Sequence, residues 1–145
     1  MAQISRSALL MYSAQEMYQL VNDVDAYPEF LPGCSETTVL LDQADRMKAS
    51  IKVSKAGISQ TFVTENTLVR DESITMNLLE GPFKYLTGGW TFTALDDQAC
   101  KVSLDLEFEF SSTIIKLAFG RVFHELIGSM VKSFSNRAKT VYGER

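Results

Sequence analysis

The most extended hydrophobic pattern lies at the C-terminal end of the chain. Apolar residues recur at helical spacing from Thr113 to Tyr142 and fall on one broad arc of a predicted helix. At a rise of 1.5 Å per residue, this helix is about 40 Å long, enough to lie across a whole sheet. The pattern predicts one buried face, made of Ile115, Phe119, Val122, Phe123, Leu126, Ile127, Met130, Phe134 and Val141.

Residues 35–110 instead alternate between apolar and polar side chains, which is typical of strands with one face toward water. Val102 and Leu104, for example, alternate with Ser103 and Asp105. The alternation is interrupted by turn-forming residues, at positions 43–45, 56–57, 70–72, 81–82 and 96–98. Five breaks at hairpin spacing predict about six antiparallel strands.

The N-terminal part of the chain predicts one further strand and short helices. Residues 2–11 alternate in the same way as the later strands. Ser13 and Glu16 have the spacing of a capping box, which begins a helix that we expect to end near Asp25. Residues 27–34 contain two prolines among apolar side chains, a pattern that favours a turn packed inward.

This order of elements predicts the fold class. Consecutive strands followed by one long helix are typical of an α+β protein with two layers, because alternating βαβ units would place helices between the strands. We therefore expect a curved antiparallel sheet of about seven strands around the C-terminal helix, with short helices after the first strand. The chain has 145 residues and contains no repeat or linker, so residues 1–145 are expected to form a single domain.

Charge is distributed unevenly along the chain. Residues 1–113 carry 8 Lys and Arg against 16 Asp and Glu, whereas residues 114–145 carry 6 against 2, which gives −8 and +4. Within the predicted helix, Arg121, Lys132 and Lys139 share one edge and are candidates for contacts with phosphates. A solvated helix face is the simpler interpretation of the same pattern.

The expected compartment is the cytoplasm. The first residues lack the apolar core of a signal peptide, and no later run is long enough to span a bilayer. Cys34 and Cys100 lie far apart and form no CxxC motif. Because disulfides are unusual in reducing compartments, both cysteines are expected to be buried free thiols.

The residue types that support catalysis or metal binding are sparse. His124 is the only histidine and falls on the polar side of the predicted helix, so we expect it at the surface. Glu107 and Glu109 lie on the solvated face of a strand, and Gly88 and Gly89 indicate a bend or bulge inside a strand. No catalytic residue, metal site or resident cofactor is predicted, and the protein is not expected to be an enzyme.

The abundant aromatic residues leave two interpretations open. The helix offers Phe119, Phe123, Met130 and Phe134, and the sheet offers Phe62, Trp90, Phe92, Phe108 and Phe110. These side chains are compatible with a fully packed core and with a cavity between sheet and helix. Arg137 also falls within the apolar arc, where a cation must reach solvent, pair with an acid or line the mouth of a pocket.

Several motifs are similar to those of the START-like superfamily, in its coenzyme-Q-binding branch that is often labelled cyclase/dehydrase. The resemblance covers nearly the whole chain and is specific only when the motifs are taken together. The matching stretches are Met17-Tyr18 to Val24, Tyr27-Pro28-x-Phe30-Leu31-Pro32-x-Cys34, Val53-Ser54-Lys55-Ala56-Gly57, Gly81-Pro82-Phe83-Lys84, Gly88-Gly89-Trp90-x-Phe92, Phe108-Glu109-Phe110, Leu117 to Phe123 and Met130-Val131-x-x-Phe134-x-x-Arg137-Ala138.

This resemblance implies a helix-grip fold with a hydrophobic tunnel between the sheet and the terminal helix. It implies a non-enzymatic protein that carries a polyprenyl quinone such as ubiquinone, or a similar lipid, in support of respiratory electron transport, with transient contact to a membrane surface. The predicted wall consists of Phe30, Leu31, Trp90, Phe92, Phe119, Phe123 and Met130, with Arg137 as a further ligand-binding candidate. Gly33 departs from the bulky aromatic of many quinone-binding relatives.

A second role also occurs in this family. One bacterial member is described as a toxin that binds the large ribosomal subunit and blocks its joining with the small subunit. For that role, the candidate contacts are Arg121, Lys132 and Lys139. Quinone binding ranks first and ribosome binding second at this level, and the two roles are not mutually exclusive.

Overall fold

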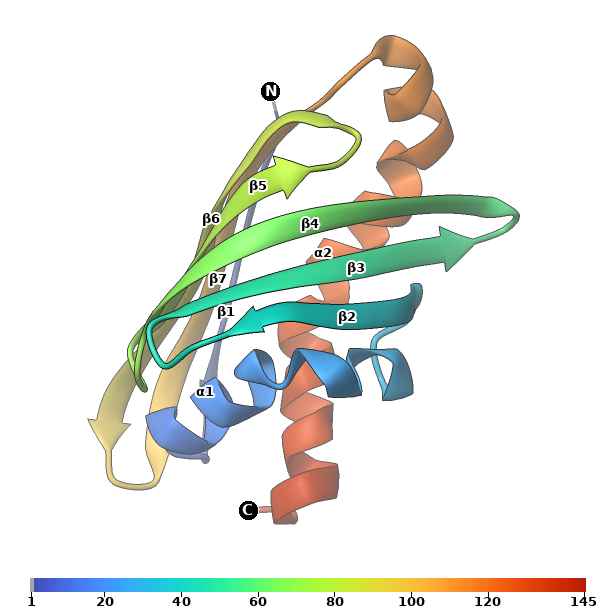
Figure 1. Ribbon diagram of the computed structural model, residues 1–145. Coiled ribbons are helices and arrows are strands. Elements are labelled where there is room, and N and C mark those ends of the chain that lie inside the picture. The colour runs from blue at the N-terminus through green and yellow to red at the C-terminus, as the bar shows by residue number, and fades with distance from the viewer. Residues whose placement is uncertain (1) are drawn as a thin grey trace.

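The computed structural model describes residues 2–145 and confirms the α+β architecture (Figure 1). Seven strands precede one long helix, and the only other helical segments follow the first strand within the described residues. The strands are β1 (Ala2–Leu10), β2 (Cys34–Asp42), β3 (Arg46–Lys55), β4 (Ile58–Val69), β5 (Ser73–Glu80), β6 (Phe83–Asp96) and β7 (Ala99–Phe110). The helical segments are α1 (Ala14–Asn22), the 3₁₀ helix η1 (Val24–Glu29) and α2 (Thr113–Tyr142).

The strands form one antiparallel sheet in the order β1-β7-β6-β5-β4-β3-β2. The first strand pairs with the last, so β1 and β2 are the two edges, and α1 and η1 carry the chain from one edge to the other. Figure 1 shows the sheet curving around α2, with α1 lying beside the C-terminal half of that helix. The structure has a break between strands at each of the five places where the sequence predicts a turn.

Two glycines in β6 permit the close approach of neighbouring strands where the sheet bends. Gly88 has φ +133°, and an added Cβ there would lie 2.1 Å from the carbonyl oxygen of Asp105 on β7. At Gly89 the same addition would meet the carbonyl oxygen of Ile74 on β5 at 2.1 Å. The sequence pattern indicated this bend, because glycine inside a strand usually marks such a position.

The predicted capping box begins α1. The Ser13 hydroxyl accepts from the Glu16 amide at 3.0 Å, and the Glu16 carboxylate accepts from the Ser13 amide at 2.9 Å. Helix α1 ends at Asn22, close to the expected position, and η1 continues the chain with Pro28 inside it. The buried hydroxyl of Tyr27 donates to the carbonyl oxygen of Val21, which ties η1 to α1.

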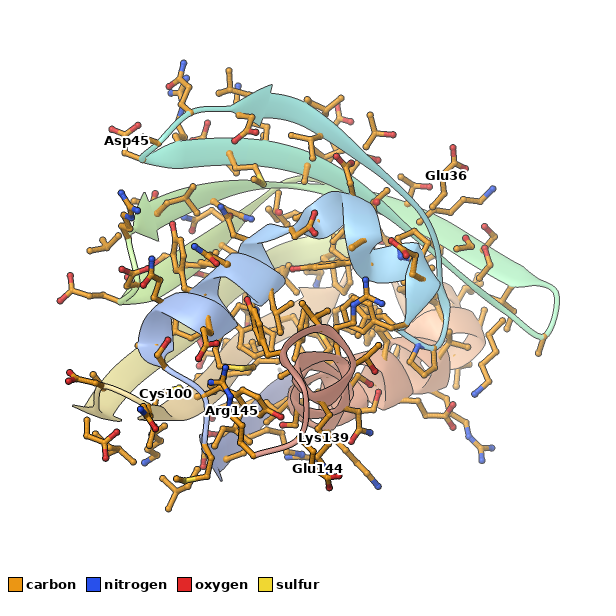
Figure 2. All side chains as sticks on the ribbon, turned by 90° about the horizontal axis from the view of Figure 1, so that it is seen from below. Glu36, Asp45, Cys100, Lys139, Glu144 and Arg145 are labelled. Atoms are coloured by element: carbon orange, nitrogen blue, oxygen red, sulfur yellow. The ribbon has the colours of Figure 1, made fainter. Side chains whose placement is uncertain are left out.

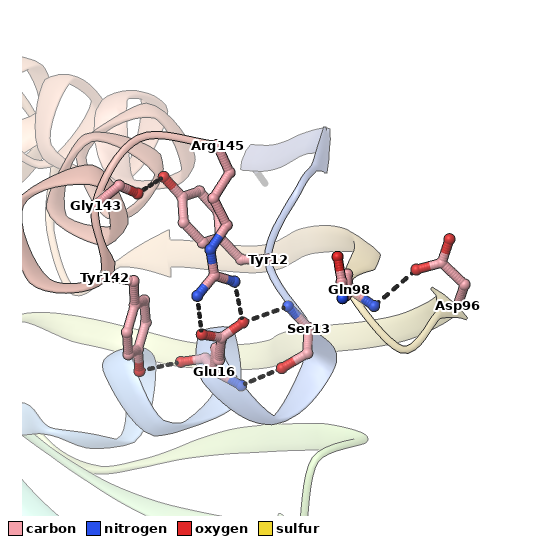
Figure 3. A network of polar contacts seen from close by, with 8 residues as sticks. All are labelled: Tyr12, Ser13, Glu16, Asp96, Gln98, Tyr142, Gly143 and Arg145. Atoms are coloured by element: carbon pink, nitrogen blue, oxygen red, sulfur yellow. Dashed lines mark hydrogen bonds and ion pairs between the residues drawn. The ribbon is translucent and has the colours of Figure 1, made fainter.

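Four side chains hold the C-terminal end of α2 against α1, and we call this group the C-terminal clasp (Figure 3). Arg145 forms two hydrogen bonds to the Glu16 carboxylate at 2.6 and 2.8 Å. The Tyr142 hydroxyl donates to the Glu16 carbonyl at 2.9 Å, and the Tyr12 hydroxyl donates to the carbonyl of Gly143 at 2.8 Å. The Arg145 hydrogen bonds hold the pKa of Glu16 below its usual value, despite opposing desolvation.

The apolar arc of α2 is buried as predicted except at its ends. Val141 is 48 % exposed and Ile115 is half-buried, whereas Phe119, Phe123 and Phe134 are fully buried. Within residues 2–145, neither α-helix has a stretch that is long and apolar enough to cross a membrane.

Candidate functional site

The inner face of α2 is the first candidate site, and Phe123 lies at its centre. Its ring contacts five other aromatic rings, with centroid distances from 4.9 to 6.1 Å. Three of these five pairs are edge-to-face, a preferred geometry of aromatic packing, and the other two are tilted. The partners are Phe62, Phe83, Phe108, Phe110 and Phe119. This half of the interface is therefore a packed aromatic core.

A small cavity lies between this core, η1 and the sheet. Its volume is about 40 Å³, whereas pockets that enclose drug-sized ligands measure roughly 300–1,000 Å³. The lining is largely apolar and comes from η1, α2 and strands β3 to β7, namely Val24, Tyr27, Ala49, Ile51, Phe62, Thr64, Asn66, Met76, Leu86, Trp90, Leu106, Phe123, Leu126, Ile127 and Met130. In this conformation the cavity has no room for an isoprenoid tail.

Three of the predicted wall residues, Trp90, Phe123 and Met130, line this cavity. Phe119 is fully buried in the aromatic core near the start of α2. Phe92 is also buried, but it packs edge-on against Tyr18 of α1 at 5.8 Å and does not line the cavity.

The loop candidates Phe30 and Leu31 directly follow η1 in the chain. Phe30 is half-buried and packs on the ring of Phe134 at 5.1 Å, while Leu31 is buried. Arg137 stacks over the Phe30 ring at 5.0 Å and lies 3.7 Å from the Glu29 carboxylate. The cation in the apolar arc thus pairs with an acid and an aromatic ring, and none of these residues lines the cavity.

Thr64 and Asn66 are cavity residues that the sequence interpretation missed. Both are buried on β4, and the Thr64 hydroxyl donates to the Asn66 side-chain oxygen at 3.0 Å. The sequence contains a pattern that could have identified them, because the period of two places both residues on the same face of β4 as Phe62 and Leu68. Thr64 and Asn66 supply a hydroxyl and an amide group to the lining. The hydroxyl of Tyr27, which also lines the cavity, donates to the carbonyl oxygen of Val21.

The outer face of α2 is the second candidate site. Arg121, Lys132 and Lys139 are all exposed on it, as their shared edge in the sequence predicts. Arg121 lies 3.4 Å from Glu125, which also pairs with Lys55 on β3 at 2.8 Å. Figure 2, seen from below the molecule, shows Lys139 on the side of α2 that faces away from β2 and β3.

The remaining reactive side chains within the described residues lie on different elements, His124 on α2, Cys34 on β2 and Cys100 on β7. His124 is exposed and lines a polar surface groove of about 290 Å³ with Lys84, Lys116 and Glu109. Cys34 and Cys100 are buried and unpaired, as expected, and burial raises the pKa of each thiol to about 11. No cluster of His, Cys, Asp and Glu suited to a metal ion occurs among residues 2–145.

Comparison with known protein families assigns the chain. Residues 10–135 match the family described as polyketide cyclase / dehydrase and lipid transport. The chain belongs to this family. The match covers α1, η1, β2 to β7, the part of α2 up to Ser135 and the whole cavity lining, so the resemblance seen in the motifs is confirmed.

Within the polyketide cyclase / dehydrase family, the chain has close full-length relatives. It is 60 % identical to the ribosome association toxin RatA of Vibrio cholerae, over 99 % of this chain and 100 % of that protein. It is 56 % identical to RatA of Escherichia coli, over 100 % of this chain and 92 % of that protein. A more distant relative is the mitochondrial coenzyme Q-binding protein COQ10 homolog B of Xenopus laevis, at 26 % identity over 97 % of this chain and 59 % of that protein.

Solved structures show the same fold. A crystal structure of a Thermus thermophilus protein superposes with a TM-score of 0.80 at 16 % identity, covering 94 % of this chain and 96 % of that chain. A START superfamily protein of Mycobacterium smegmatis gives 0.79 at 19 % identity, covering 96 % of this chain and 98 % of that chain. At such identities the likeness establishes the START-like fold, which confirms the fold class predicted from the sequence.

Proposed function

We propose that this protein is a non-enzymatic ribosome-binding toxin of the RatA type, which binds the large ribosomal subunit and blocks its joining with the small subunit in the cytoplasm. The observation that carries the proposal is the full-length similarity to proteins named ribosome association toxin, at 56–60 % identity. This reverses the order of preference that the sequence motifs suggested.

The geometry of the two faces of α2 supports this order. The inner face meets a core with only about 40 Å³ of free space, which favours a structural role for that face. The outer face presents Arg121, Lys132 and Lys139 to solvent on a protein whose net charge is −4. A cationic face on an otherwise acidic protein directs a polyanion such as ribosomal RNA to that face.

Co-sedimentation with large subunits over a series of salt concentrations tests the proposal. Replacing Arg121, Lys132 and Lys139 by Glu is expected to abolish salt-sensitive association, because it removes three candidate phosphate contacts. The matched control replaces three cations away from α2 by Glu, namely Lys52 on β3, Arg70 in the turn after β4 and Lys101 on β7. Equal association by both triple variants, with melting unchanged, would remove the outer face of α2 from the mechanism.

Binding of an apolar ligand is the second candidate function. It is supported by a specific feature, the Thr64 and Asn66 pair inside an otherwise apolar cavity, which offers polar groups to a ligand head. The similarity to a coenzyme Q-binding protein points to the same class of ligand. This function requires the cavity to expand, and native mass spectrometry of protein purified from its own host, with lipid extraction, tests it. A protein free of quinone and lipid would contradict it.

A further inference from the structure

A lone arginine of the edge strand β1 lies beside the outer face of α2. Ala2, Ile4, Ala8 and Leu10 share the face of β1 that turns toward the helix, and Ile4 is buried there. By the period of two, Arg6 belongs to the same face of β1, but its side chain is exposed. It is thus the one charged residue in a row of apolar positions, and its Nη1 atom donates to the backbone carbonyl of Ser5 at 2.9 Å.

The Arg6 side chain contacts α2 at Gly128. A Cβ added at Gly128 would lie 3.7 Å from the Nη2 atom of Arg6, so the guanidinium lies directly against the helix. At 3.6 residues per turn, Gly128 lies within about 40° of the line through Arg121, Lys132 and Lys139. Gly128 contributes no side chain of its own, and Arg6 supplies a cation at that place instead.

Arg6 therefore fills the widest gap in the cationic row. At 1.5 Å per residue, Gly128 is about 10 Å along the helix from Arg121 and about 6 Å from Lys132, and Lys139 is about 10 Å further. Four cations from two elements thus follow one line of about 27 Å. We call this line, made of Arg6, Arg121, Lys132 and Lys139, the cationic ridge.

The ridge is also free of competing acids over most of its length. The ion pairs within residues 2–145 include Arg121 with Glu125, but none involves Arg6, Lys132 or Lys139. Asp105, the acid nearest to Arg6 in the strand register, bonds to Ser5, whose side chain points to the opposite face of the sheet. Three of the four cations therefore have no acidic partner within the described residues, and Arg6 donates only to a backbone carbonyl.

The ridge lacks the anchors of a protein–protein contact. Large apolar residues that are exposed on α2 lie outside the ridge, at Ile114 and Leu117 in the turns before Arg121 and at Val141 after Lys139, and none lies between Arg121 and Lys139. Protein interfaces take most of their binding energy from buried aromatic or apolar anchors, whereas polyanions are held by spaced cations. A row of separated point charges without apolar anchors is complementary to a nucleic acid backbone.

We infer that the cationic ridge binds the sugar–phosphate backbone of RNA, and that Arg6 contacts a phosphate in the same way as Arg121, Lys132 and Lys139. This inference rests on the proposed ribosome-binding function and names the chemistry of the contact. A different explanation exists for Arg6 alone, because an inward-pointing charge on an edge strand prevents edge-to-edge association of sheets. The experiment separates these two explanations.

The test is the salt dependence of binding to large subunits and to protein-free RNA extracted from them. Each phosphate contact contributes roughly 0.7–0.9 to the slope of log Kobs against log salt. Arg6→Gln is expected to lower that slope by about one contact on both ligands. The matched control Lys101→Gln, a cation on the outer face of the neighbouring strand β7, is expected to leave the slope unchanged.

A second variant keeps Arg6 in place. Gly128→Glu sets a carboxylate beside the guanidinium. Gly128 is half-buried, an added Cβ would make only ordinary contact with Arg6 at 3.7 Å, and glutamate forms helices better than glycine. It is expected to lower the slope at least as much as Arg6→Gln.

The possible failures are distinct. An unchanged slope for Arg6→Gln would overturn the inference. If that variant also self-associates, edge protection becomes the role of Arg6. Wild-type protein that binds the free RNA with the expected slopes but not the subunits would instead refute the proposed function while supporting the ridge.

Discussion

The inner and outer faces of α2 are built from one continuous helix but have opposite properties. On the inner face, Phe119, Phe123 and Phe134 are fully buried and contact aromatic rings from the sheet and η1. On the outer face, Arg121 and Lys132 are exposed. The inner face therefore stabilises the fold, and the outer face is available to a partner.

This difference bears directly on function. In a family named for cyclases and lipid transport, the space beneath the terminal helix is the obvious place to look for a ligand. Here that space is nearly filled, with about 40 Å³ remaining. A fold that can enclose a ligand does not imply that each member does so, since the side chains decide how much volume is left.

The largest expected effect comes from the inner face. Phe123→Ala is expected to lower the free energy of unfolding by about 3–5 kcal/mol, the usual cost of removing a fully packed phenylalanine. Denaturant unfolding measures it. A much smaller loss would mean that Phe123 borders a larger void than the structure shows, and it would restore the apolar ligand as the first candidate.

Overpacking the cavity should have the next largest effect. Met130 is buried at the cavity wall, and the free space there is small. Met130→Trp is therefore expected to destabilise the protein by about 1–3 kcal/mol. If the variant instead melts like the wild type while losing any co-purified quinone, the cavity expands readily and its closed form is one of two states.

A smaller effect is expected where the clasp joins α2 to α1. Because Arg145 lowers the pKa of Glu16 in the folded state, this ion pair contributes stability above the ordinary glutamate pKa and loses it as pH falls through the lowered value. Glu16→Gln should keep the capping box but remove this contribution. The difference in unfolding free energy between wild type and variant is thus expected to shrink on acidification, whereas Glu36→Gln, at an exposed position of β2, serves as control.

The smallest effect is expected on the outer face. Leu117 is 81 % exposed, and Leu117→Ser is expected to change the free energy of unfolding by no more than about 0.5 kcal/mol. A denaturant melt beside that of Phe123→Ala gives the contrast between the two faces in one experiment. A loss above about 1 kcal/mol would show that the outer face also stabilises the fold.

The sequence by itself determined the order and limits of most elements. The period of the apolar residues defined α2 from Thr113 to Tyr142, and the capping box at Ser13 marked the start of α1. Turn residues separated the strands at the observed places. These features depend on interactions between residues a few positions apart, so a local pattern contains enough information to predict them.

Only the tertiary structure decided between a tunnel and a packed core. The same aromatic residues are compatible with both, and the outcome depends on how side chains from η1, α2 and five strands fill one volume. It also placed Phe92 beneath α1 instead of at the cavity, and Arg6 beside Gly128. These contacts join residues far apart in the chain, and their geometry follows from curvature and packing, which no periodicity in the sequence records.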